Sequence, residues 1–166
     1  MLTIRDATRA DAAAVAAIWN PIILETVITF NPLERRADEI AAMIITRQSQ
    51  GRAFLIAEDD HQPLGFATYD QFRPGPGNAR SMEHTINLAP EARGQGAGRA
   101  LLLALEDHAA SAGHHLMIAA ITGSNTGSIR FHEGLGYLHV GRMPELGWKF
   151  GSYHDLVLMQ KFLGRG

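Results

Sequence analysis

Residues 88–102 read LAPEARGQGAGRALL. A strand-like segment precedes it, three alternate glycines lie at Gly94, Gly96 and Gly98, and a helix-like run follows. Backbone amides in a glycine-rich turn can come close to a phosphate, and the helix N-terminus behind them favours an anion. The stretch therefore predicts either a site for a phosphate-bearing cofactor or only a tight turn between a strand and a helix.

Two common phosphate-binding loops do not fit this stretch. A P-loop needs Lys and then Ser or Thr after its last glycine, whereas Gly98 is followed by Arg99 and Ala100. A dinucleotide fingerprint needs Gly or Ala in the place of Arg99, and it normally opens a β–α alternation. The P-loop is therefore excluded, and the dinucleotide interpretation is disfavoured.

The spacing Arg93-x-x-Gly96-x-Gly98 resembles the acyl-CoA signature of the GNAT superfamily of N-acetyltransferases. Residues 124–137, SNTGSIRFHEGLGY, resemble the second signature of that superfamily, an Asn followed by a short helix and a Leu-Gly-aromatic ending. One helix and one strand separate the two segments, as the superfamily requires. The resemblance implies acetyl-CoA as co-substrate, bound by Ile86, Asn87, Leu88, Arg93, Gly94, Gln95, Gly96, Ala97, Gly98, Arg99, Asn125 and Ser128.

The rest of the chain predicts one α/β domain over residues 1–166 with the order β-α-α-β-β-β-α-β-α-β-β. Strands that follow one another between 52 and 88 should be antiparallel, and the strand–helix–strand unit over 82–121 should be parallel and right-handed. We expect a GNAT fold with a mixed, mostly antiparallel sheet of about seven strands and helices on both faces. The first helix should end near Asn20-Pro21 or just beyond, 26–34 should be an ordered loop, the last short helix should cover 128–136, and the last two strands should cover 137–140 and 153–162.

Within the superfamily, the chain most resembles the phosphinothricin and methionine sulfoximine or sulfone acetyltransferases. This resemblance implies that acetyl passes directly from acetyl-CoA to the primary amine of a small amino-acid-like substrate, and it implies a homodimer. The segments that carry it are 17–20, 83–85, 129–133, 143–147, 149–151, 155–156 and 159–160.

Glu83 and His132 are the catalytic candidates. An α-ammonium has a pKa of about 7.7–8.0, so a base must remove its proton before the nitrogen can attack. Glu83 opens the strand that leads to the glycine loop, and the related group has a catalytic glutamate there; alternatively, Glu83 is solvated or paired with Arg80. His132 occupies the place where many relatives have a tyrosine that protonates the thiolate; alternatively, it only orients its neighbours.

Four residues are expected at the amine substrate: Phe30, Arg73, Trp148 and Lys149. Arg73 and Lys149 agree with the related group and suit an anionic substrate. Arg73 could equally be a charge on a surface loop. The loop after it, 74–79, lacks the aromatic residues of the group, so the amine substrate can differ.

Composition and charge disfavour several classes of partner and of cellular location. The formal net charge is −2, which does not suit a nucleic-acid footprint, and no apolar run approaches the length of a membrane span. The chain has no cysteine, and its histidines and carboxylates lack metal-ligand spacing, so we expect no metal. Charges near the N-terminus argue against a signal peptide, and a cytoplasmic location follows as an expectation.

The sequence leaves two other functions open. The first is acetylation of a protein N-terminus or a polyamine, which would use the same co-substrate. The second is a non-catalytic acyl-CoA sensor, against which the candidate base Glu83 argues.

Overall fold

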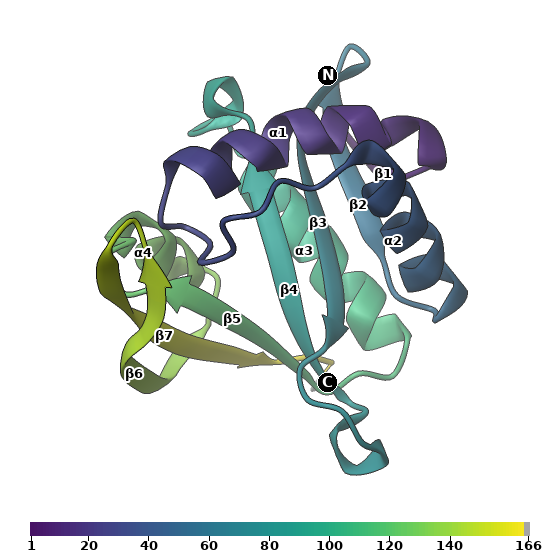
Figure 1. Ribbon diagram of the computed structural model, residues 1–166. Coiled ribbons are helices and arrows are strands. Elements are labelled where there is room, and N and C mark those ends of the chain that lie inside the picture. The colour runs from purple at the N-terminus through teal and green to yellow at the C-terminus, as the bar shows by residue number, and fades with distance from the viewer. Residues whose placement is uncertain (165–166) are drawn as a thin grey trace.

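Seven strands form one mixed sheet in the computed structural model, which describes residues 1–164 (Figure 1). The strand order is β1-β2-β3-β4-β5-β7-β6, and only the β4–β5 pair is parallel. The strands are β1 (Leu2–Asp6), β2 (Phe54–Asp59), β3 (Gln62–Gln71), β4 (Ser81–Leu88), β5 (Leu116–Thr122), β6 (Leu138–Lys149) and β7 (Ser152–Phe162). The helices are α1 (Ala12–Glu25), α2 (Ala37–Ser49), α3 (Ala97–Ser111) and α4 (Thr126–Gly134).

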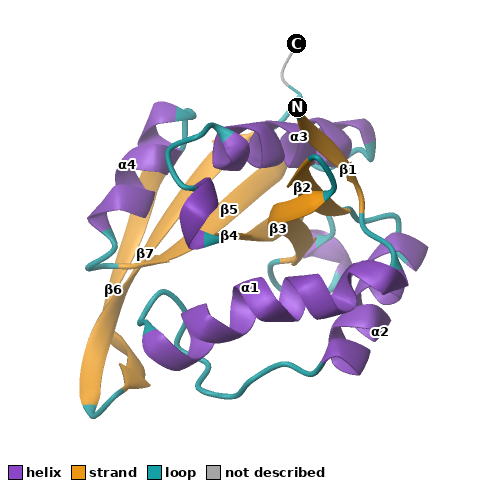
Figure 2. Cartoon of the chain, turned by 90° about the horizontal axis from the view of Figure 1, so that it is seen from above, coloured by secondary structure: helices purple, strands orange, loops and turns teal. Residues whose placement is uncertain are grey.

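Helices cover both faces of the sheet (Figure 2). On one face α1 and α2 bury a core that includes Trp19, Ile40 and Phe54, and on the other α3 buries Leu101 and Leu105. Both faces of β2 and β3 are therefore covered, which explains their long apolar runs. The expected fold class and element order are confirmed.

The parallel strands β4 and β5 pair only at the beginning of β4. Ser81, Met82 and Glu83 pair with β5, and beyond Glu83 the two strands diverge (Figure 1). From Thr85 to Leu88, the edge of β4 that faces β5 lacks the ladder found in the rest of the sheet. This divergence opens the middle of the sheet, and the candidate site lies there.

Three element boundaries differ from the sequence-based expectations. Helix α1 continues through Pro21 to Glu25, because Ile22 and Ile23 still bury their side chains. Helix α4 starts two residues earlier than expected. Strand β6 runs far past residue 140, to Lys149, and its pairing with β7 is irregular at two places. Its residues are mostly exposed and do not alternate regularly between apolar and polar, so the pairing with β7 maintains the strand.

No helix within residues 1–164 is both long enough and apolar enough to cross a membrane.

Candidate active site

A cavity of about 600 Å³ lies between the end of β4, the glycine loop and α4; we call it the loop cavity. It brings together most of the residues expected to bind the co-substrate. Those that line it are Ile86, Asn87, Leu88, Arg93, Gly94, Gly96, Gly98, Arg99, Asn125 and Ser128. Gln95 and Ala97 do not line it: the Gln95 side chain bonds back to the carbonyl oxygen of Glu91, and Ala97 is buried in the core.

The glycines give the loop a backbone that other residues rarely adopt. Gly94 and Gly96 have φ of +76° and +84°, and the left-handed Gly96 is the N-cap of α3. Gly98 lies so close to β4 that an added Cβ would meet the Leu88 side chain at 3.2 Å. With exposed Arg93 and Arg99 beside the amides of the helix start, this cradle fits the pyrophosphate of acetyl-CoA.

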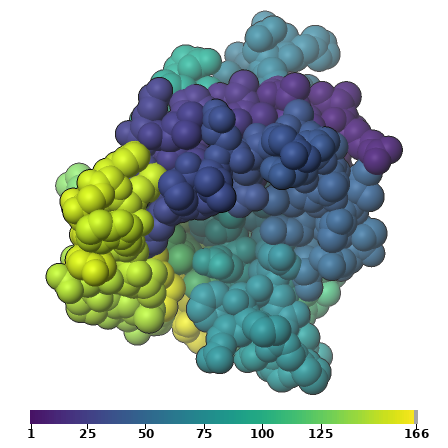
Figure 3. Space-filling model, in the orientation of Figure 1, coloured from purple at the N-terminus to yellow at the C-terminus, as the bar shows by residue number. Residues whose placement is uncertain are grey.

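A second cavity of about 300 Å³ lies where β4 and β5 diverge; we call it the Glu83 cavity. Its walls come from β4, from β5, and from the chain around the end of α1 (Figure 3 shows this chain, dark blue, between α1 and the β6–β7 hairpin). Six residues line both cavities, so the two are neighbours: Ile28, Ile86, Asn87, Asn125, Ser128 and His132.

Glu83 is half-buried at the last paired position of β4. Burial raises the pKa of its carboxyl, and the charge of Asp70, directly opposite on β3, raises it further. Within residues 1–164 the carboxylate makes no hydrogen bond or ion pair, with Arg80 or any other residue. Glu83 is thus a free carboxylate on the wall of a cavity.

His132 is buried and holds both ring nitrogens in hydrogen bonds. Its Nδ1 lies 2.7 Å from the carbonyl oxygen of Ser128, which can only accept, so Nδ1 carries the proton. Its Nε2 must then accept from Nε2 of His84, 3.0 Å away. Burial lowers the pKa of both imidazoles, to about 3 for His84, and keeps them neutral.

Asn125 is the N-cap of α4. Its side-chain oxygen accepts a hydrogen bond from the Ser128 amide at 3.3 Å, which satisfies one free donor of the helix start. This bond fixes the Asn125 side chain on the wall that the two cavities share.

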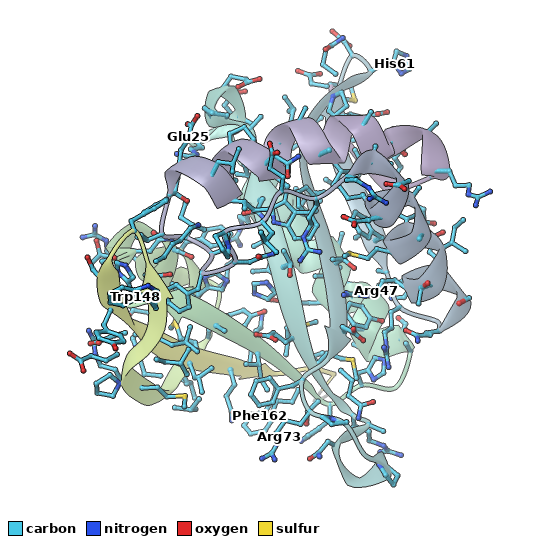
Figure 4. The ribbon with its side chains drawn as sticks, in the orientation of Figure 1. Glu25, Arg47, His61, Arg73, Trp148 and Phe162 are labelled. Carbon is cyan, nitrogen blue, oxygen red and sulfur yellow. The ribbon has the colours of Figure 1, made fainter. Side chains whose placement is uncertain are left out.

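Only one of the four expected substrate residues lines a cavity. Phe30 lies on the wall of the Glu83 cavity and stacks on His154. Arg73 lies on an exposed loop that folds back on itself, since Gln71 bonds to its carbonyl oxygen. Trp148 is exposed on β6 against Tyr153, well away from Arg73 (Figure 4). The structure therefore does not gather Arg73 and Trp148 around Glu83 within one chain.

Lys149 requires a correction. Its side chain is buried, and Nζ donates to the carbonyl oxygens of Thr26 and Thr29, each at 2.7 Å, and to that of Ile23. An ammonium has three N–H groups, so these bonds use all of them. Lys149 ties the end of α1 to the segment that carries Phe30, and we assign it this structural role instead of substrate binding.

The Glu83 cavity also contains residues that sequence reasoning missed. Trp19 and Arg35 line it, and the Arg35 guanidinium stacks on the Trp19 ring, 4.2 Å from its centroid. The pair is formed by residues from α1 and from the loop before α2, which are not adjacent in sequence. The Ala-Ile-Trp-Asn segment at 17–20 was the available signal, although it did not point to Arg35.

Comparison with known proteins agrees with this geometry. The model of the "Acetyltransferase (GNAT) family" matches residues 22–137, which include the glycine loop and Asn125. The chain belongs to the GNAT family of acetyltransferases. The expected family is thus confirmed, and so is the expectation that the chain is an acetyl-CoA-dependent acyltransferase.

Two curated relatives within this GNAT family match nearly the whole chain. The L-methionine sulfoximine/L-methionine sulfone acetyltransferase of Salmonella typhimurium is 36% identical over 96% of this chain and 93% of its own length. The phosphinothricin N-acetyltransferase of Alcaligenes faecalis is 32% identical over 99% of this chain and 84% of its own. The chain is therefore close to GNAT enzymes of amino-acid-like substrates, as its sequence indicated.

Two solved structures are similar in fold and sequence. An acetyltransferase from Salmonella typhimurium with its cofactor acetyl-CoA has a TM-score of 0.96 at 36% identity and covers 100% of this chain and 96% of its own. A ribosomal-protein-alanine N-acetyltransferase from Brucella melitensis has a TM-score of 0.94 at 36% identity, over 97% of this chain and 99% of its own. Residues 1–164 contain no cluster of three or more possible metal ligands.

Proposed function

We propose that this GNAT enzyme acetylates the primary amine of a small amino-acid-like substrate, of the methionine sulfoximine, methionine sulfone or phosphinothricin type. One observation carries the proposal: a cavity with a free, half-buried carboxylate adjoins the cavity of the glycine loop. Co-substrate and amine thus have separate but neighbouring places. The named activities of the relatives support the same class of substrate.

Glu83 is the base in this proposal. Acetyl-CoA, when bound, supplies the activated acyl group. The raised pKa brings the carboxyl closer to neutral pH, where a base is most effective at removing a proton from an ammonium. Glu83 accepts that proton, directly or through a water, and the freed nitrogen attacks the thioester carbonyl carbon. The C–S bond then breaks, and CoA leaves as a thiolate that takes its proton from solvent. The unpaired edge of β4 beyond Glu83 offers backbone amides to the pantetheine arm and to the developing oxyanion.

His132 orients the site rather than donating a proton. Its single proton, on Nδ1, is held by the Ser128 carbonyl oxygen, and its Nε2 is occupied by His84. No ring proton of His132 is left for a thiolate. In this role the imidazole fixes the wall between the two cavities, where it faces both.

Release of free thiol from acetyl-CoA in the presence of an amine panel tests the proposal. The panel contains L-methionine sulfoximine, L-methionine sulfone, L-phosphinothricin, spermidine and a peptide with an N-terminal alanine. We expect turnover with at least one of the first three and no thiol release above background with the others. Turnover confined to the peptide or the polyamine overturns the proposed substrate, and acetyl-CoA binding without any amine-dependent release indicates a sensor.

Acetylation of a protein N-terminus remains the second candidate, since one structural relative carries such a name. The Glu83 cavity, at about 300 Å³, is at the small end of small-molecule sites, which favours a single amino acid.

We also propose a homodimer and a cytoplasmic location. Strands β6 and β7 expose large apolar side chains, which is uncommon on the surface of a monomer. They include Leu138, Val140, Met143, Leu146, Trp148 and Tyr153. Light scattering tests the dimer: we expect twice the mass of the chain, and a Val140→Asp, Met143→Asp double variant should be a monomer. Fractionation of cells tests the location.

A further inference from the structure

Arg35 is the one cationic side chain on the wall of the Glu83 cavity, within the residues that the structure describes. Its half-buried side chain points to a role that its neighbour Arg36 cannot have, because Arg36 is exposed and pairs with Asp38. No carboxylate within residues 1–164 forms an ion pair with Arg35. A guanidinium without a counter-ion in a cavity is available to an anionic ligand.

The Nε atom of Arg35 makes this argument specific. It is buried and has no hydrogen-bond partner among the described residues. A buried donor without a partner carries a penalty of about 1–3 kcal/mol, so such atoms call for an explanation. Nε and one Nη of an arginine together form the fork that binds a carboxylate through two parallel hydrogen bonds.

Arg35 is also held in place before any ligand arrives. The Asn20 side chain accepts from the Arg35 amide at 2.9 Å and donates to its carbonyl oxygen at 3.0 Å. Trp19 directly precedes Asn20 in α1, and its ring lies under the Arg35 guanidinium. Consecutive residues of α1 thus fix both the backbone and the side chain of Arg35, which lowers the entropy lost on binding.

The charges of the cavity match those of a free amino acid. Glu83 and Arg35 are its only charged lining residues within the described chain, apart from the histidines, which burial keeps neutral. A zwitterion carries an ammonium for the carboxylate and a carboxylate for the guanidinium. A polyamine or the N-terminus of a peptide offers the ammonium but no α-carboxylate.

We propose that Arg35 binds the α-carboxylate of the amine substrate, so that the enzyme acts on free α-amino acids and not on amines that lack this group. This inference rests on the proposed function. It places recognition of the α-carboxylate on the segment between α1 and α2. Arg35 in this role determines specificity, while Glu83 remains the base.

The test compares L-methionine sulfone with its carboxamide, which keeps the ammonium and the side chain. The wild-type enzyme should have a kcat/KM at least about tenfold higher for the acid. Arg35→Gln should raise KM for the acid about 10- to 100-fold and change kcat/KM for the carboxamide less than about threefold. Acetyl-CoA affinity, measured by calorimetry, should stay unchanged and reports that the variant is folded.

Arg36→Gln is the matched control, because it removes the same charge from the adjacent, exposed position. It should leave both kcat/KM values as in the wild type. Equal use of acid and carboxamide by the wild type, or equal losses on both in Arg35→Gln, overturns the inference and leaves the proposed function standing. Failure of the wild type to acetylate any amino acid of the panel overturns the proposed function, and the inference with it.

Discussion

His84 and His132 stack with their rings 6° from parallel and join through their Nε2 atoms, 3.0 Å apart. The pair connects β4 with α4: His132 lies on the wall that the two cavities share, and His84 lines the Glu83 cavity. Because burial keeps both rings neutral and each uses its Nε2 in this bond, we expect the pair to act on the stability of the fold and not on proton transfer.

His84 should make the protein less stable as the pH falls. Burial holds its folded-state pKa at about 3, whereas an unfolded histidine titrates near 6.5. Between these values the unfolded chain binds a proton that the folded chain excludes, so the free energy of unfolding falls with decreasing pH by at most about 1.4 kcal/mol per unit. Urea unfolding at several pH values should therefore give a steeper curve for the wild type than for His84→Gln.

The glutamine in that variant can still donate to His132, so the comparison isolates the titration of His84. His132 is present in both proteins, and its own contribution largely cancels. Parallel curves between pH 6.5 and 4 would show that His84 is protonated in the folded state, against this account.

Asp70 should set the pH at which the proposed base, Glu83, loses its proton. Its charge helps to raise the pKa of Glu83, and it also neutralises Arg47 and Arg52. Asp70→Asn removes a negative charge and releases two positive ones, and both changes lower the pKa of Glu83. The acid side of the kcat/KM profile should move to lower pH. Asp107 is an exposed carboxylate on α3, so Asp107→Asn should leave the pH profile unchanged. An unchanged profile in Asp70→Asn would show that Asp70 does not affect the pKa of the base.

A comparison of alanine variants at Gly96 and Gly51 tests the role of the glycine loop. Both have positive φ, and an added Cβ would meet nothing within 4 Å at either position. Alanine at each should lower the free energy of unfolding by about 1–2 kcal/mol, from backbone strain. Only Gly96→Ala should also weaken acetyl-CoA binding in calorimetry, by roughly tenfold, because it moves the amides that we expect to bind the pyrophosphate. Equal affinity in the two variants would place the pyrophosphate elsewhere.

Gly147 should control the position of Phe30. A Cβ at this residue would lie 2.5 Å from the Phe30 ring, whereas the same atom at Gly141 of the same strand meets nothing within 4 Å. Gly147→Ala should therefore displace Phe30 from the Glu83 cavity and raise KM for the amine on the order of tenfold. Gly141→Ala should keep the wild-type KM, and acetyl-CoA affinity should be unchanged in both. If KM is the same in both variants, Phe30 does not bind the amine.

The sequence predicted the glycine loop well because its geometry is encoded locally. Gly94 and Gly96 lie where the backbone needs positive φ, and the residues beside them supply the amides. The order of strands and helices was equally predictable, since each element carries its own apolar pattern. These parts needed no knowledge of distant contacts.

The wall of the Glu83 cavity could not be predicted in this way. Arg35 and Arg36 look alike in the sequence, and only the packing against α1 leaves the first half-buried and the second exposed. The sequence shows that Lys149 is charged. It does not show the three carbonyl oxygens, more than 100 residues away, that accept its hydrogen bonds. Whether a charged side chain meets substrate or backbone is decided by such long-range contacts.

In the proposed function, Glu83 takes the proton from the ammonium of an amino acid during acetyl transfer. The most direct measurement is the rate of thiol release from acetyl-CoA with the best amino acid of the panel, for the wild type and Glu83→Gln, over a range of pH. We expect kcat about 10²- to 10⁴-fold lower in Glu83→Gln, with no acid limb from this group, while acetyl-CoA affinity is retained. Glu133→Gln on α4, an exposed position, should behave as the wild type. Near-normal turnover of Glu83→Gln across the pH range would contradict the account.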